Sequence, residues 1–212
     1  MKKPSDGLHA LLALPAAYLL TKGLASLTGV LFFGKTGVYL AQMTMTLLAW
    51  GIWPMILKGW RGQNTAQRIN NKKKAVWITA GALLGFPAQM GLGMLTTGWI
   101  NWTGVEPGTS VPMPETALEW FLGLMALVIL PALVEESFFR GMMLRGLTKP
   151  LGTAAVVAMT TVLFALSHGS AAALPANLLM GATAAILAIR GGLPASILFH
   201  LTYNLAAVLL TA

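Results

Sequence analysis

A small set of polar side chains in the second half of the chain has the composition of an acid–base hydrolytic site. The set consists of Glu135, Glu136, Arg140, His168, His200 and Asn204. All of them fall within long apolar runs, where a charged group at the centre of a bilayer costs about 2.5–3.5 kcal/mol on insertion scales. Several such groups in one chain need a structural or a functional reason.

The spacing of these residues predicts which of them share a helix face. Residues four apart lie on one face of a helix, so Glu136 can pair with Arg140, and His200 lies beside Asn204. Glu135 is rotated by about 100° from Glu136 and points towards a different neighbour.

Each group alone has a structural explanation. Glu136 with Arg140 can be a buried ion pair, and the histidines and the asparagine can form hydrogen bonds between helices. Together they are harder to explain, because two adjacent carboxylates and one guanidinium leave a negative charge uncompensated. Glu135 is therefore either protonated or paired with another group such as an imidazolium.

Attack by water is the chemistry that this set favours. The chain has no cysteine, and neither Ser137 nor Ser167 has a motif that would activate its hydroxyl. A carboxylate in an apolar site can take a proton from water near neutral pH, and a neutral imidazole can share that task. Hydrolysis of an amide also needs donors aimed at the developing oxyanion, and His200 with Asn204 on one helix face suits that role.

The composition requires that membrane-spanning helices position this set. The chain is 56% hydrophobic and only 9% charged, with a mean hydropathy of +0.72. A soluble domain carries about a quarter charged residues. We therefore predict an all-α, polytopic transmembrane bundle of about seven spans, within a range of about six to eight. It forms a single integral membrane domain over residues 1–212.

The predicted spans follow the apolar runs. They are residues 8–33, 36–57, 75–100, 117–147, 151–168, 173–189 and 193–210. Residues 1–116 supply the N-terminal helices, and residues 117–212 carry the polar set. Pro131 predicts a kink in the fourth helix. In the third, Gly85, Gly91 and Gly93 are expected to permit close packing of helices.

The distribution of charge predicts the orientation of the chain. With Lys2 and Lys3 in the cytoplasm, every basic residue of the 14 except Lys22 and Lys35 falls on the cytoplasmic side, which fits the positive-inside rule. That side is predicted to include Arg140, Arg145, Lys149 and Arg190. The segment 101–116 on the other side contains Glu106 and Glu115 but no Lys or Arg. The net charge of +8 comes without a basic–aromatic platform, so no nucleic-acid partner is predicted.

Three short motifs resemble those of a known family. They are Glu135-Glu136-x-x-x-Arg140, Phe164-x-x-x-His168 and His200-x-x-x-Asn204. In this order they resemble the pattern of the CAAX-protease and bacteriocin-processing (CPBP, or ABI) family, the type II CAAX prenyl endopeptidases. The resemblance covers about residues 117–212.

The resemblance implies a glutamate-type intramembrane endopeptidase without a cofactor. It implies that Glu135 with His168 activates water and that His200 and Asn204 form the oxyanion hole. Glu136 with Arg140 would orient the site. The implied partner is a membrane-associated protein or peptide in the lipid bilayer, in a prokaryotic cell membrane, where relatives are linked to peptide maturation and bacteriocin immunity. A prenylated substrate is not assumed, and no oligomeric state is predicted.

Two alternatives remain open at the level of sequence. In the first, the protein is a zinc peptidase with His168, His200 and a glutamate as ligands, although the chain has no H-E-x-x-H motif. In the second, the protein is a non-catalytic immunity or scaffold protein, and the polar set is a proton relay or a structural lock.

Overall fold

The computed structural model describes residues 34–51, 71–107 and 112–211, and all structural statements below concern these ranges. Their regular elements are all helices, which confirms the predicted fold class. The predicted first span, 8–33, and the end of the second lie outside the described residues. Four helices are long and apolar enough to cross a membrane, judged by length and composition.

The described helices follow the predicted spans closely. The first is α2 (Gly34–Thr46), which continues into the π-helical η1 (Leu47–Gly51). Then come α4 (Asn71–Thr103), α8 (Thr153–Ser167), α9 (Leu174–Gly191) and α10 (Leu193–Thr211). Between α4 and α8 a continuous helix runs over Ala117–Leu151. Its parts are α5 (Ala117–Leu124), η3 (Met125–Ile129), α6 (Leu130–Glu136), η4 (Ser137–Leu144) and α7 (Arg145–Leu151).

The long helix Ala117–Leu151 is irregular around the residues of the polar set. Its start is fixed by a capping box, in which Thr116 and Glu119 each accept a hydrogen bond from the other's backbone N–H. Pro131 lacks an N–H, and just before it the Leu130 N–H bonds to Met125 O, five residues back, in a π-turn. A second π-helical segment, η4, begins directly after Glu136. Wide turns of this kind occur often at functional sites, because they re-aim side chains.

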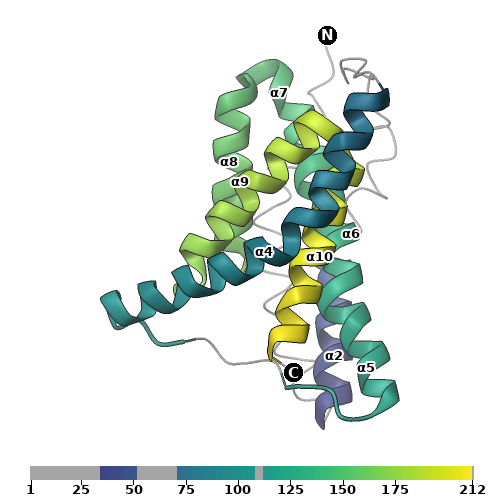
Figure 1. Ribbon diagram of the computed structural model, residues 1–212, viewed down its shortest axis with the longest axis vertical. Coiled ribbons are helices and arrows are strands. Elements are labelled where there is room, and N and C mark those ends of the chain that lie inside the picture. Colours follow the sequence, from purple (N-terminus) through teal and green to yellow (C-terminus); the bar gives the residue numbers. More distant parts are fainter. Residues whose placement is uncertain (1–33, 52–70, 108–111, 212) are drawn as a thin grey trace.

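Close packing between α4 and α10 depends on glycine in the first half of α4. A Cβ atom at Gly85 would overlap Thr202 and the backbone of α10, and one at Gly81 would overlap Ala195. The predicted role of Gly85 is therefore confirmed. For Gly91 and Gly93 the described helices do not bear out the prediction, since no described atom lies within 4 Å of a Cβ built at either position. α4 bends in its middle, where Pro87 lies, and its second half runs out of the bundle (Figure 1).

α8 is shorter than the two helices that follow it, α9 and α10. α8 has 15 residues, so it extends about 22 Å at 1.5 Å per residue, less than the ~30 Å hydrocarbon core of a bilayer. The turn between α8 and α9 therefore lies part-way along the molecule (Figure 1). There it meets the second half of α4, where Trp99 Nε1 donates to Ala171 O at 3.0 Å.

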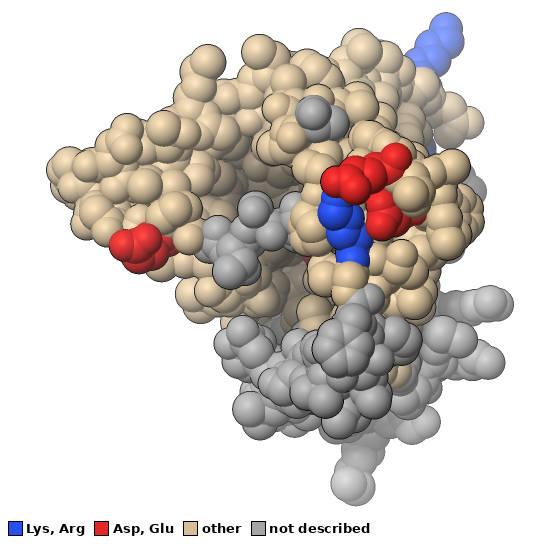
Figure 2. All heavy atoms as spheres, turned by 90° about the horizontal axis from the view of Figure 1, so that it is seen from below, with Lys and Arg blue, Asp and Glu red and all other residues tan. Residues whose placement is uncertain are grey.

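The two ends of the molecule differ in charge. The start of α4, α7 and the α9–α10 turn lie at one end of the molecule (Figure 1). Their described basic residues are Lys72, Lys73, Lys74, Arg145, Lys149 and Arg190. The opposite end shows acidic side chains (Figure 2), and there Lys35 Nζ lies 2.5 Å from Glu115 Oε1. This difference in charge between the two ends is typical of a membrane protein. One basic residue assigned to a cytoplasmic loop was misplaced: Arg140 is buried within the bundle, where only 1% of its surface is exposed.

Candidate active site

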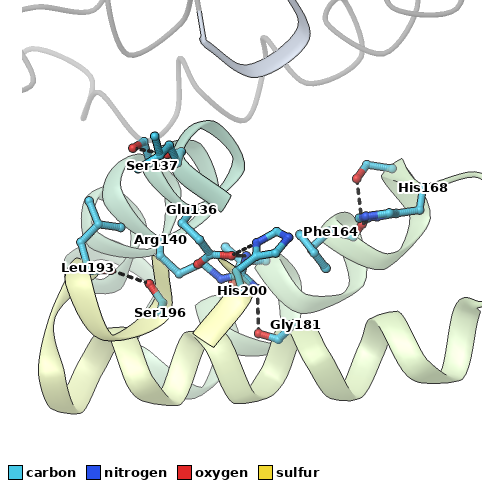
Figure 3. Close-up of polar contacts among 12 residues, drawn as sticks. Glu136, Ser137, Arg140, Phe164, His168, Gly181, Leu193, Ser196 and His200 are labelled. Carbon is cyan, nitrogen blue, oxygen red and sulfur yellow. Dashed lines mark hydrogen bonds and ion pairs between the residues drawn. The ribbon is translucent and has the colours of Figure 1, made fainter. Parts of the chain in front are cut away.

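Three charged or polar side chains from two helices meet in the interior of the bundle. Arg140 Nη1 donates to Glu136 Oε1 at 2.8 Å, and His200 Nδ1 donates to the same oxygen at 2.9 Å (Figure 3). All three residues are buried. Because a buried charge is stable only when it is paired, this network fixes the relative position of the long helix and α10.

The guanidinium of Arg140 is held from two further sides. Its Nη2 donates to Gly181 O on α9 at 2.8 Å, and its Cζ lies 4.6 Å from the centre of the Phe164 ring. A Cβ atom at Gly181 would lie 3.1 Å from Phe164 Cδ1 and 3.5 Å from Arg140 Nη2. The absence of a side chain at Gly181 therefore lets α9 approach closely enough for its carbonyl to reach the guanidinium.

Glu135 lies at the edge of this network. It is 9% exposed, and its Oε2 atom is buried without a hydrogen-bond partner among the described residues. Glu135 directly precedes Glu136 in the sequence, but it takes no part in the hydrogen bonds that Glu136 makes. No described residue uses the acceptor capacity of Glu135 Oε2, and the same holds for the buried Oε2 of Glu136.

His168 caps the C-terminal end of α8, on the other side of Phe164. Its Nδ1 bonds to Phe164 O at 2.8 Å. A carbonyl oxygen only accepts, so Nδ1 carries the proton, and in the neutral ring Nε2 holds the lone pair. The Phe164 ring lies 4.7 Å from His168 and 6.0 Å from His200, between centroids, and Figure 3 shows it between the two. His168 is exposed, whereas His200 is buried.

Asn204 lies one helical turn after His200 on α10. It is half-buried and makes no hydrogen bond with the described part of the chain. The structure thus brings Glu136, Arg140 and His200 into direct contact. It places His168 across Phe164 from them, and it shows no direct contact of Glu135 with His168.

A cavity of about 540 Å³ opens beside His168. The second half of α4 and the segment after it form one wall, and the α8–α9 turn forms the other. Its lining includes Thr96, Ile100, Glu106, Pro107, His168 and Ser170. The volume falls within the range of about 300–1,000 Å³ that is usual for ligand sites.

The sequence did not single out two residues that shape the site. Gly181 is one small residue among several in α9, so nothing in its sequence context marked it. Glu106 carried a signal, because the segment 101–116 contains glutamates and no basic residue. Its position in the cavity became clear only from the fold of α4.

The residues named for a zinc site do not form one in this conformation. Across the described ranges, no group of three His, Asp or Glu side chains lies close enough to hold a metal ion. Phe164 separates His168 from the network of His200 and Glu136. The donors would have to move for a three-ligand site to form.

Residues 117–206 match the family model of the Rce1-like type II CAAX prenyl endopeptidases. This region belongs to that family. The match begins at the first residue of α5, ends within α10, and includes all three motifs. Comparisons with curated proteins and with solved structures give no match. With the apolar helices, the family identifies an integral membrane protein that is a protease in general terms.

Proposed function

We propose that this CAAX-protease-like protein is an intramembrane endopeptidase that hydrolyses a peptide bond of a membrane-associated protein or peptide. Glu135 and His168 activate the water, His200 and Asn204 stabilise the oxyanion, and Glu136 with Arg140 orients the site. The observation that carries the proposal is the buried Glu136–Arg140–His200 network, with an unpartnered Glu135 oxygen at its edge. No metal takes part in this mechanism.

The charges of the network support this assignment. With Glu135 and Glu136 as carboxylates, Arg140 as guanidinium and His200 as imidazolium, the cluster is neutral. In that state Glu136 accepts from both cations, and Glu135 keeps a free lone pair. A purely structural ion pair needs only Glu136 and Arg140, and it leaves the second carboxylate without a purpose.

The hydrogen bond of His168 suits it to a role as a base. Because Nδ1–H is fixed on Phe164 O, the lone pair of Nε2 is available to a water molecule. His168 also lines the cavity, where a substrate can reach it. In this proposal a water molecule lies between Glu135 and His168, which make no direct contact with each other.

The same reasoning gives His200 the role of a donor. Its Nδ1–H is bound to Glu136 Oε1, so in the imidazolium form Nε2–H is the one donor left for a substrate oxygen. Asn204 follows on the same face of α10, and its amide has no partner among the described residues. Together they supply the two donors that an oxyanion requires.

The proposed reaction balances without a co-reactant. Water gives a proton to the Glu135–His168 pair as its oxygen bonds to the carbonyl carbon, and the carbonyl oxygen becomes the oxyanion. The carbon–nitrogen bond then breaks, and the same proton passes to the leaving nitrogen. The products are a carboxylic acid and an amine.

We further propose that the protein lies in a prokaryotic cell membrane with the basic end of the bundle, and the N-terminus, in the cytoplasm. In this orientation the α8–α9 turn and His168 lie at bilayer depth. A membrane-bound substrate would therefore reach the cavity from within the membrane.

Cleavage of defined peptides by the purified protein in proteoliposomes tests the proposal. Glu135→Gln and His168→Ala should each lower the rate by about 10²-fold or more, the usual contribution of acid–base catalysis. Ser137→Ala is the matched control, because the Ser137 hydroxyl bonds to its own helix at Leu133 O. Cleavage that survives in the Glu135 variant refutes the assignment, and loss of cleavage in the Ser137 variant points to a serine nucleophile.

A further inference from the structure

We infer that the cavity beside His168 binds a cationic group of the substrate, and that Glu106 selects it. The inference rests on the proposed function, because it treats this cavity as the place where substrate meets His168. It adds the charge of the substrate segment, which the motif residues do not specify.

The charge of the lining carries the argument. Among the described residues that line the cavity, Glu106 is the one carboxylate, and none is Lys or Arg. Glu106 is exposed and makes no ion pair or hydrogen bond with any described residue. An acidic group in a cavity walled by uncharged side chains attracts a cation more strongly than the same group does in open water.

The other side chains of the cavity contribute shape and little polarity. The turn that faces Glu106 consists of His168, Gly169, Ser170 and the alanines 171–173. Such a wall leaves room for an extended peptide. The Trp99–Ala171 hydrogen bond fixes the turn against α4, so the distance across the cavity is set by the fold.

The same charge disfavours an anionic segment. A free C-terminal carboxylate in this cavity would face Glu106 without a cation to compensate it, and juxtaposed like charges oppose binding. A basic side chain or a free α-amino group would be paired. The geometry therefore points to a cationic group within a few residues of the scissile bond.

Equilibrium binding in the Glu135→Gln background tests the inference independently of catalysis. The probes are fluorescent apolar decapeptides that are identical except for a central lysine, norleucine or glutamate. The protein is held in phosphatidylcholine nanodiscs, and empty nanodiscs give the background. The lysine peptide should bind about tenfold more tightly than the glutamate peptide, which corresponds to about 1.4 kcal/mol.

Variants at Glu106 should change this preference. Glu106→Gln should abolish it, and Glu106→Lys should reverse it in favour of the glutamate peptide. Glu115→Gln is the matched control, because Glu115 lies at the same end of the molecule, pairs with Lys35 and does not line the cavity. Since Glu106 is exposed, its replacement should leave the thermal unfolding of the protein unchanged.

One further comparison completes the test. The norleucine peptide with a free amino terminus, compared with its acetylated form, distinguishes binding of an α-amino group from binding of a basic side chain. Equal binding of all probes, or a preference unchanged in Glu106→Lys, overturns the inference. The proposed function fails separately, if Glu135→Gln still cleaves peptides that the wild type cleaves.

Discussion

The Glu136–Arg140 pair gives the most quantitative prediction of this account. Both side chains are fully buried, and Nη1 lies 2.8 Å from Oε1. Replacing Glu136 by Gln preserves shape but leaves the guanidinium without its counter-charge. Removal of one partner of a buried ion pair costs about 3–5 kcal/mol. We therefore expect Glu136→Gln to lower the free energy of unfolding by about that amount.

A second substitution separates charge from shape. In Glu136→Gln with Arg140→Met, both charges are absent, and the methionine packs against Phe164. Replacement of a whole buried pair by groups of similar volume is often neutral or stabilising. The double variant should therefore regain the stability of the wild type, whereas its peptidase activity stays lost, because His200 no longer has an anionic partner.

Reversible unfolding in mixed micelles, followed by tryptophan fluorescence, measures these differences. Glu115→Gln serves as the control, because the Lys35–Glu115 pair is largely exposed and its loss should change stability little. A Glu136→Gln protein as stable as the wild type would refute the reasoning, since the pair could not then be both buried and charged. Full activity in the double variant would refute the role assigned to Glu136 and Arg140.

Other predictions follow from the glycines, the chelatable metals and the charge distribution. Gly181→Ala should lower kcat by displacing Arg140 and Phe164, while Gly93→Ala, with open space around its Cβ, should leave activity unchanged. Gly85→Leu should separate α4 from α10 and destabilise the protein, measured by its unfolding midpoint. Treatment with a chelator should not reduce peptide cleavage. A purified protein that contains one equivalent of zinc and is inhibited by a chelator would favour the zinc peptidase. Since the chain has no cysteine, single cysteines can be introduced. A membrane-impermeant maleimide should label Glu115→Cys but not Lys149→Cys in intact cells.

Much of the helical architecture could be predicted from hydropathy alone. A bilayer demands long apolar helices, and the boundaries of α8, α9 and α10 lie within a few residues of the predicted ones. The helix α4 extends a few residues beyond its predicted bounds at both ends. The shape of α4 could not be predicted. Gly91 and Gly93 follow a pattern typical of packed helices, but the bend at Pro87 carries them out of the bundle.

The candidate site was predicted unevenly for a similar reason. Local spacing identified the Glu136–Arg140 pair, because both residues lie on one helix. The contact of His200 with Glu136 joins residues far apart in the sequence. The spacing within each motif singled out both residues but did not predict their contact. The same limit applies to Gly181 and Phe164, whose positions around Arg140 depend on how closely α8 and α9 approach. Arg140 was also placed in a loop by its charge alone, whereas the counter-charge of Glu136 allows it to be buried.

Hydrolysis in ¹⁸O-labelled water by the wild type and by Glu135→Gln is the measurement that tests the central claim most directly. The wild type should release a new carboxyl terminus that carries one labelled oxygen, and Glu135→Gln, folded as judged by circular dichroism, should release at least about 10²-fold less of it. Equal label release by the two proteins would contradict the assignment of water activation to this carboxylate.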